Sequence, residues 1–349
     1  MAVAPNMGDA KAERAVPATV VLITKSRLFI QMKYRTKVAV FLVGVLIMLL
    51  FGIRCANAQP SLLIFEYGQM GTLFRLHIAA MDSAKAAKAA QEAFQLLDSL
   101  NLIMSDYRAD SELNQLSATA GSGQWVTVSP ALWEVIQQAQ TVSQLTNGAF
   151  DITIGALTQL WRRAARQKEL PDKQRLKAAL SVTNYRLIQL RPNKRQVKLV
   201  RKGMKLDLGG IAKGYANAKM QEILQKNGFR QTLIEGGGDL LAGDAPQDKT
   251  GWRILLSSDT VILQNTALAT SGDDFRFIEI GEQRYSHIIN PRTGRGVTHR
   301  TRVSVRCSDA TLADAFSSAF SVLGEKQSRK YARRPKSKYG LVSVFWNSD

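Results

Sequence analysis

The amino-acid sequence predicts an α+β fold: a single compact domain in which a mixed or antiparallel sheet packs against helices. Of the 349 residues, 45% are hydrophobic, which is enough apolar side chain for a large core. Strand-like runs occur in pairs between long amphipathic stretches rather than alternating strictly with them, which favours α+β over a doubly wound sheet. Only two cysteines are present, so neither a disulfide framework nor a zinc site of cysteine ligands supports the fold.

The first 58 residues are assigned to an N-terminal extension and a secretory signal. A basic stretch precedes an apolar run from Val38 to Ile53, and Ala56-Asn57-Ala58 follows, which predicts cleavage after Ala58. A retained anchor helix is the alternative, but this run is shorter than the ~20 residues that a spanning helix needs. We therefore expect an exported protein, in the periplasm or on the outer face of the inner membrane, with its folded domain in residues 59–349.

Four helices are expected in the domain. Apolar residues recur every three or four positions between Ala87 and Met104, as on an amphipathic helix. Ser129-Pro130 is an N-cap followed by proline at the first helical position, and it opens a second helix that closes at 147–148. A third helix is expected over 211–226, and a fourth over 312–323, before Gly324.

Short β-branched or alternating runs predict the strands. They are Leu62 to Tyr67, Thr72 to Ile78, Leu187 to Leu190, Gln196 to Val200, Trp252 to Ser257, Phe275 to Ile280, Arg302 to Arg306 and Leu341 to Trp346.

The segment Leu206 to Tyr215 runs from a strand end through two glycines into a helix start. Glycines let the backbone approach a ligand, and a helix N-terminus with a nearby lysine, here Lys213, attracts phosphate. A plain glycine-rich turn explains the segment equally well, because neither a dinucleotide fingerprint nor a Walker loop is present.

Two further segments concentrate small and polar residues. Glu235 to Asp239 holds three consecutive glycines, which indicates a backbone pressed against a ligand or another strand. The stretch from Ala269 to Gly294 contains small hydroxyls, a tight turn and His287, for which functional and structural roles are equally favoured.

Asp314 and Ser318 are four residues apart, so they share one face of the fourth predicted helix. That helix is apolar almost all round, and a buried aspartate needs a partner. A hard cation such as Mg²⁺, which prefers oxygen ligands, is one candidate and Lys213 is another.

Together these segments resemble the FAD:protein FMN transferases, the ApbE family, whose fold is T-fold-like. The resemblance spans roughly residues 66 to 324. The matching motifs are Met70-Gly71-Thr72, Met104 to Tyr107, Ser111 to Leu113, Gly148 to Asp151 with Gly155, Leu160-Trp161, Leu206 to Tyr215, Gly236 to Asp239, Ala269 to Asp273, Ser286 to Gly294 and Ala313 to Ser318.

The resemblance implies a set of binding residues. FAD would contact Met70, Tyr107, Ala149, Phe150, Asp151, Asp207, Lys213 and Ile289, with His287 near the phosphates. A divalent cation, usually Mg²⁺, would bind the backbone carbonyl of Gly210 and the side chains of Asp314 and Ser318. Two positions depart from the family: Ser318 stands where threonine is common, and Asn290 where aspartate is common.

The implied chemistry is a transfer of the FMN moiety of FAD to a Thr or Ser hydroxyl of a target protein, with release of AMP. The target would be a protein such as a redox-pump subunit or an exported reductase. His287 and Asp314 are both candidates for the base that accepts the hydroxyl proton. Within the family, hydrolysis of FAD to FMN and AMP is an alternative that the aromatic Tyr107 disfavours, and FAD storage without chemistry is a second alternative.

The net charge of +19 raises the question of a polyanionic partner. Without residues 1–58, 39 basic and 26 acidic side chains remain. An exported protein meets little nucleic acid, and no basic stripe with interleaved aromatic residues is apparent, so nucleic acid is not expected. An anionic membrane surface is the more plausible partner, and a solvated charged face is the simpler explanation.

Overall fold

The computed structural model describes residues 37, 39–43, 59–256, 259–272, 277–299, 302–332 and 340–347. The chain divides into two units, residues 1–59 and 60–349, and the second contains the sheets and helices discussed below. Most of the predicted signal segment lies outside the described residues. Among the helices that are described, none has the length and apolar character that crossing a membrane requires.

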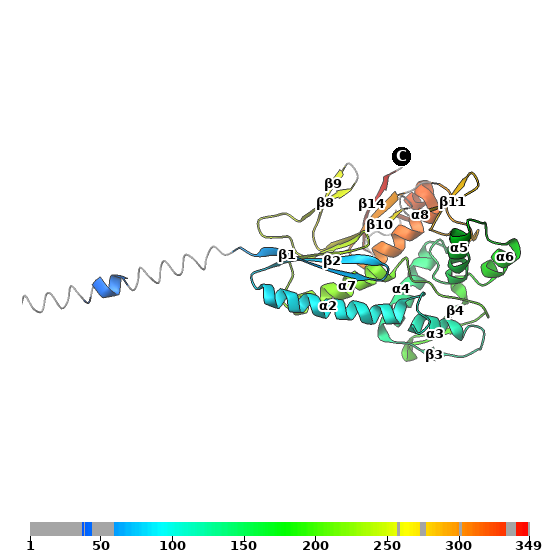
Figure 1. Ribbon diagram of the computed structural model, residues 1–349, viewed down its shortest axis with the longest axis horizontal. Helices are drawn as coiled ribbons and strands as arrows, with labels where there is room; N and C mark the ends of the chain where they lie inside the picture. The colour runs from blue at the N-terminus through cyan, green and yellow to red at the C-terminus, as the bar shows by residue number, and fades with distance from the viewer. Residues whose placement is uncertain are drawn as a thin grey trace, which may run out of the picture. The chain divides into compact units, whose positions relative to one another are not determined.

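A seven-stranded antiparallel sheet forms the centre of the domain, in the order β1-β2-β6-β7-β10-β13-β14 (Figure 1). Every neighbouring pair in it is antiparallel, which confirms the predicted fold class. The bounds are β1 Ser61–Gln69, β2 Thr72–Ala80, β6 Thr232–Gly236, β7 Asp239–Ala242, β10 Thr266–Gly272, β13 Arg302–Cys307 and β14 Leu341–Asn347.

Smaller sheets complete the strands of the domain. They are the three-stranded sheet β3 Val126–Thr127, β5 Gln196–Leu199 and β4 Ile188–Arg191, and the hairpins β8 Trp252–Leu256 with β9 Asp259–Leu263 and β11 Phe277–Ile280 with β12 Gln283–Ser286. The sequence did not predict β3, β6, β7, β9, β10 and β12.

Three helices pack side by side on the large sheet: α2 (Ser83–Met104), α7 (Ala212–Lys226) and α8 (Ala310–Ala332) (Figure 1). The other helices are α3 Glu112–Ala118, α4 Pro130–Leu145, α5 Gly155–Gln167 and α6 Lys173–Ser181, with 3-10 turns over Tyr185–Leu187 and Pro192–Lys194. Asp82 and Ser129 cap α2 and α4 through their side chains. The four predicted helices are therefore confirmed, while α3, α5 and α6 were not predicted.

The predicted end of the last helix, α8, needs a correction. It was expected to end at Gly324, and that residue does leave the helical conformation, with φ 70° and ψ 168°. Helical backbone then resumes and continues to Ala332. Upstream, Cys307 is fully buried and burial raises the pKa of its thiol to about 11, as expected for a cysteine that packs in the core.

Glycine permits two close approaches that shape the site. A Cβ on Gly214 of α7 would lie 2.2 Å from the carbonyl oxygen of Ala310, so α7 and α8 touch backbone to backbone. Gly237 and Gly238 form the turn between β6 and β7 with φ of 58° and 92°, and a Cβ on Gly237 would lie 2.9 Å from Thr72 Oγ1. The three consecutive glycines therefore make a hairpin turn beside the tip of the β1–β2 hairpin.

Candidate active site

A buried group of charges lies where α7, α8 and β7 meet; we call Lys213, Asp239 and Asp314 the lysine cluster. The ammonium of Lys213 donates to Asp239 Oδ2 at 2.6 Å and lies 3.3 Å from both carboxylate oxygens of Asp314. The backbone N–H of Gly214 also donates to Asp314, at 3.1 Å. Lys213, one of the two partners that the sequence suggested for the buried Asp314, is therefore confirmed as a partner.

The protonation of this cluster follows from its burial. Both carboxylate side chains are only 4% exposed. Burial and the neighbouring Asp314 raise the pKa of Asp239 to about 7, although Lys213 opposes the shift. Burial lowers the pKa of Lys213, but the two carboxylates outweigh it and hold the pKa above its ordinary value. Lys213 is therefore a permanent cation.

Gly210 and Ser318 approach each other beside the lysine cluster. A Cβ on Gly210 would lie 2.7 Å from the Ser318 hydroxyl and 3.3 Å from the Phe150 ring, so any larger residue would fill this space. Ser318 is one turn of α8 beyond Asp314. Within the described residues, no group of three or more His, Cys, Asp or Glu side chains could hold a metal. A carboxylate, a hydroxyl and a backbone carbonyl are ligands that suit a hard cation, and their binding of one stays a prediction.

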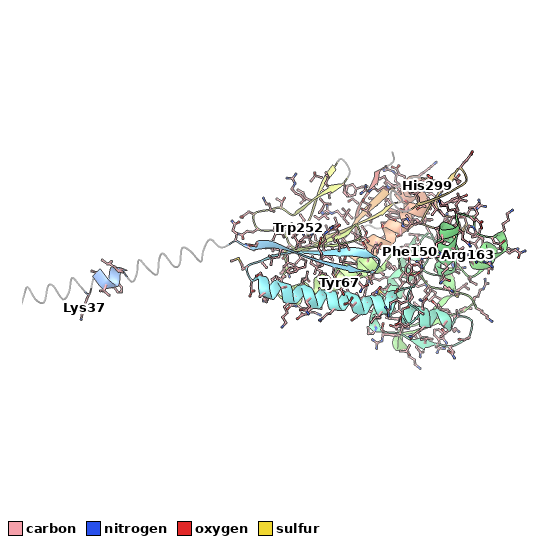
Figure 2. The ribbon with its side chains drawn as sticks, viewed as in Figure 1. Lys37, Tyr67, Phe150, Arg163, Trp252 and His299 are labelled. Carbon is pink, nitrogen blue, oxygen red and sulfur yellow. The ribbon has the colours of Figure 1, made fainter. Side chains whose placement is uncertain are left out.

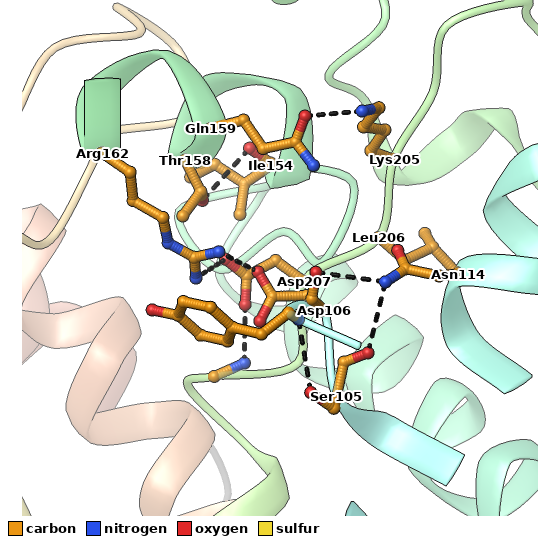
Figure 3. A network of polar contacts seen from close by, with 12 residues as sticks. Ser105, Asp106, Asn114, Ile154, Thr158, Gln159, Arg162, Lys205, Leu206 and Asp207 are labelled. Atoms are coloured by element: carbon orange, nitrogen blue, oxygen red, sulfur yellow. Dashed lines mark hydrogen bonds and ion pairs between the residues drawn. The ribbon is translucent and has the colours of Figure 1, made fainter. Parts of the chain in front are cut away.

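Tyr107 lies on a loop that α3 holds in place. Ser111 caps α3, and Asn114 in its first turn donates to the carbonyl oxygen of Asp106 at 3.1 Å (Figure 3). Asn114 also donates to the carbonyl oxygen of Arg108 at 2.7 Å. The Ser105 hydroxyl accepts from the backbone N–H of Tyr107. Tyr107 is itself 77% exposed, so a loop with a fixed backbone presents an aromatic side chain to solvent.

Arg162 of α5 joins this loop to the glycine-rich segment. Its guanidinium carbon lies 3.8 Å from the centre of the Tyr107 ring, and its nitrogens lie 2.5 Å from Asp106 and 3.9 Å from Asp207 (Figure 3). Burial and the nearby Asp207 raise the pKa of Asp106, while Arg162 acts against that shift. We call Tyr107, Arg162, Asp106 and Asp207 the tyrosine platform.

The loop from Asp207 to Gly210 connects the platform to the lysine cluster. Asp207 Oδ1 accepts from the backbone N–H of Gly209 at 2.8 Å, and the Asp207 N–H donates to the carbonyl of Ile152. Gly210 lies three residues farther on and contacts Ser318. The two groups of side chains are thus parts of one site.

The remaining predicted flavin contacts surround this loop. Met70 is at the tip of the β1–β2 hairpin, in the left-handed conformation with φ 52°. Ala149 and Phe150 are buried, and Phe150 lies in the interior of the domain (Figure 2). The buried Asp151 carboxylate accepts from the Thr153 N–H and hydroxyl and from the Tyr185 N–H, so it fastens its own loop. Their contacts with FAD stay predictions.

The segment after β12 holds two predicted site residues, one exposed and one buried. His287 is exposed directly beyond the strand, whereas Ile289 is 6% exposed and packs with Trp161 and Tyr285. The loop is attached to α5, because the indole of Trp161 donates to the carbonyl of Gly294 at 2.7 Å. His287 and Asp314 both stay candidates for the base.

Sequence reasoning missed three residues of the site. Asp239 was noted only as the end of a glycine cluster, Asp106 only as part of a motif, and Arg162 was not singled out. The position of Arg162 directly after the Leu160-Trp161 pair was the available signal. Its contacts with residues 45 and 55 positions away could not be read from spacing.

Comparison with known proteins agrees with this arrangement. The family model described as "ApbE family" matches residues 70–342. The chain belongs to the ApbE family. A curated relative from Treponema pallidum, named FAD:protein FMN transferase, is 30% identical over 312 residues, covering 82% of this chain and 86% of the relative. A relative of the same name from Vibrio cholerae is 30% identical over 271 residues, covering 74% and 80%.

Solved ApbE structures share the fold. The flavin transferase ApbE from Vibrio cholerae superposes with a TM-score of 0.71 at 26% identity, covering 83% of this chain and 98% of that one. The apo form of the flavinyl transferase ApbE from Pseudomonas stutzeri superposes with a TM-score of 0.74 at 25% identity, covering 82% of this chain and 91% of that one. The ApbE fold therefore extends over nearly the whole described domain.

Proposed function

We propose that this chain is a Mg²⁺-dependent FAD:protein FMN transferase. A Thr or Ser hydroxyl of the target protein attacks the phosphorus on the FMN side of the FAD pyrophosphate. The bond from that phosphorus to the oxygen of AMP breaks, AMP leaves, and FMN is joined to the target by a phosphoester bond. The observation that carries the proposal is the single site in which one glycine-rich loop joins an exposed aromatic ring to a permanent cation that two buried carboxylates hold.

Each part of the site has a role in this reaction. The tyrosine platform offers a face for a flat ring of FAD. The Lys213 ammonium, held protonated by its carboxylates, stabilises the negative charge that grows on the phosphate oxygens. Gly210, Asp314 and Ser318 would hold Mg²⁺, which supplies charge neutralisation at the pyrophosphate when it is bound. The hydroxyl proton passes to His287 or to Asp314.

The decisive experiment incubates the protein with FAD and Mg²⁺, with and without a flavin-accepting protein from an exported redox complex. Transfer predicts AMP release that depends on the acceptor, and an acceptor whose mass increases by one FMN on a Thr or Ser. Free FMN that forms equally fast without acceptor would instead establish hydrolysis. Tight FAD binding without AMP release under either condition would establish storage.

We also propose export to the periplasm or to the outer face of the inner membrane, because the residues before the domain have the pattern of a secretory signal. Fusing residues 32–58 to a reporter that is active only after export tests this. Retention of that fusion in the cytoplasm would contradict it.

An anionic membrane surface is proposed as a further partner. Residues 155–205 contain fifteen Lys and Arg but only two Asp and Glu, so this segment alone carries the +13 that remains for residues 59–349. Arg163 on α5 belongs to it (Figure 2). Vesicles containing phosphatidylglycerol should bind the protein at low salt and vesicles of phosphatidylcholine should not. Equal binding to both would contradict the proposal.

A further inference from the structure

Arg162 differs from the other basic residues of segment 155–205 in its ion pairs. Of the fifteen basic residues in 155–205, it alone forms an ion pair with a carboxylate in the described part of the chain. Its side chain is 26% exposed, while those of Asp106 and Asp207 are 13% and 11% exposed. The guanidinium is thus held by two largely buried carboxylates, and its flat face remains for the Tyr107 ring.

The helix that carries Arg162 is itself fixed to the site. The backbone N–H of Gly155 donates to the carbonyl of Lys205, and a Cβ on Gly155 would lie 2.8 Å from that oxygen. The Lys205 ammonium donates to Gln159 of the same helix at 2.5 Å (Figure 3). Contacts with Lys205 therefore hold the start of α5 in place, and the Arg162 guanidinium extends from this fixed helix.

Tyr107 needs that support. A side chain that is 77% exposed has few packing contacts to hold its ring, so a ligand that stacks on it must first immobilise it. The guanidinium 3.8 Å from the ring centre covers one face and restrains the ring. The opposite face is left for a flat ligand.

We infer that Arg162 is a positioning residue that holds the Tyr107 ring in place, so that a flat ring of FAD stacks on the opposite face. The inference rests on the proposed function, because it takes FAD as the ligand. Arg162 acts through Tyr107 and forms no bond with the reacting atoms. Its planar guanidinium matters as well as its charge, since the ammonium of a lysine cannot cover a ring in the same way.

The test is a double-mutant cycle on FAD binding, measured by equilibrium dialysis with Mg²⁺ present. Arg162→Lys keeps a cation beside Asp106 and Asp207 but removes the flat group, and it should weaken FAD binding about 2- to 5-fold, no more than loss of the Tyr107 ring does. In the Tyr107→Leu background the same substitution should change the dissociation constant very little. The matched control is Arg163→Lys, at the next position of α5, where the exposed guanidinium donates to Gln167.

Steady-state rates separate positioning from a general structural effect. Arg162→Lys should raise KM for FAD while kcat and the melting temperature stay close to those of the wild type. Two results would overturn the inference while leaving the proposed function intact: a loss of affinity that is equal in the wild-type and Tyr107→Leu backgrounds, or wild-type affinity in Arg162→Lys. A wild-type protein that binds no FAD would overturn the proposed function, and the inference with it.

Discussion

The lysine cluster is buried and the tyrosine platform is open, although both pair carboxylates with a cation. Lys213 pairs with Asp239 and Asp314, whose side chains are only 4% exposed, beside two helices in backbone contact, so its charge is held in place by buried carboxylates. Arg162 is also paired, but it turns one face toward an exposed ring. The same charge pairing thus serves electrostatic stabilisation in one region and the presentation of a flat surface in the other.

The largest effect is expected from the lysine cluster. Asp314→Asn removes one carboxylate that faces Lys213 and one proposed oxygen ligand. AMP release from FAD, measured by chromatography, should slow about 100-fold or more. Glu325→Gln is the control on the same helix, where the glutamate is exposed and pairs with Arg329. Near wild-type turnover in Asp314→Asn would show that the buried cluster is structural only.

A second substitution tests how tightly the helices around the lysine cluster pack. Gly214→Ala places a methyl group 2.2 Å from the Ala310 carbonyl oxygen, so α7 and α8 must move apart. Such overpacking should lower the free energy of unfolding by about 1–3 kcal/mol, measured with urea. Gly68→Ala is the control, because a Cβ there has no neighbour within 4 Å. Equal stability of the two variants would mean that the helix contact is looser than described.

Substitutions of Ser318 test the proposed Mg²⁺ site beside the lysine cluster. Ser318→Ala should raise the Mg²⁺ concentration for half-maximal activity about 10-fold or more, because a ligand oxygen is lost. Ser318→Thr keeps the hydroxyl and should stay close to the wild type. A titration in which both variants behave alike would remove Ser318 from the proposed ligands.

The smallest effect is expected at the platform. Tyr107→Leu should weaken FAD binding about 2- to 10-fold, the contribution of one aromatic pair. Its free energy of unfolding should change by no more than about 0.5 kcal/mol, because the ring is exposed. Tyr107→Phe keeps the ring and should bind FAD as the wild type does. A large loss of stability in Tyr107→Leu would contradict the contrast between the two regions.

The sequence predicted what local chemistry determines. Ser129-Pro130 marks the start of α4, the stripe up to Met104 marks α2, and Asp314 with Ser318 shares one face of α8. Lys213 was already a candidate partner for Asp314. These features depend on neighbours within a few residues, so spacing alone reveals them.

Other features depend on contacts that spacing does not show. β6 is buried along most of its length, and β10, in which every residue but Leu268 is small, is buried over its first four positions, so neither shows an alternation of exposed and buried positions. α5 begins at Gly155 without a side-chain cap, so the usual start signal is missing. Arg162 meets Tyr107 through the tertiary placement of α5, which is attached to Lys205 and to Gly294.

The loop from Asp207 to Gly210 limits how far apart the two parts of the site can lie. Asp207 belongs to the platform and Gly210 approaches the Ser318 hydroxyl, and three residues span at most about 11 Å. A ligand that engages both ends needs a flat ring and a phosphate group separated by a matching linker. On the proposed function, FAD engages the platform with a flat ring and the cluster with its pyrophosphate, so a nucleotide whose ring and pyrophosphate are held farther apart than this should reach only one of the two.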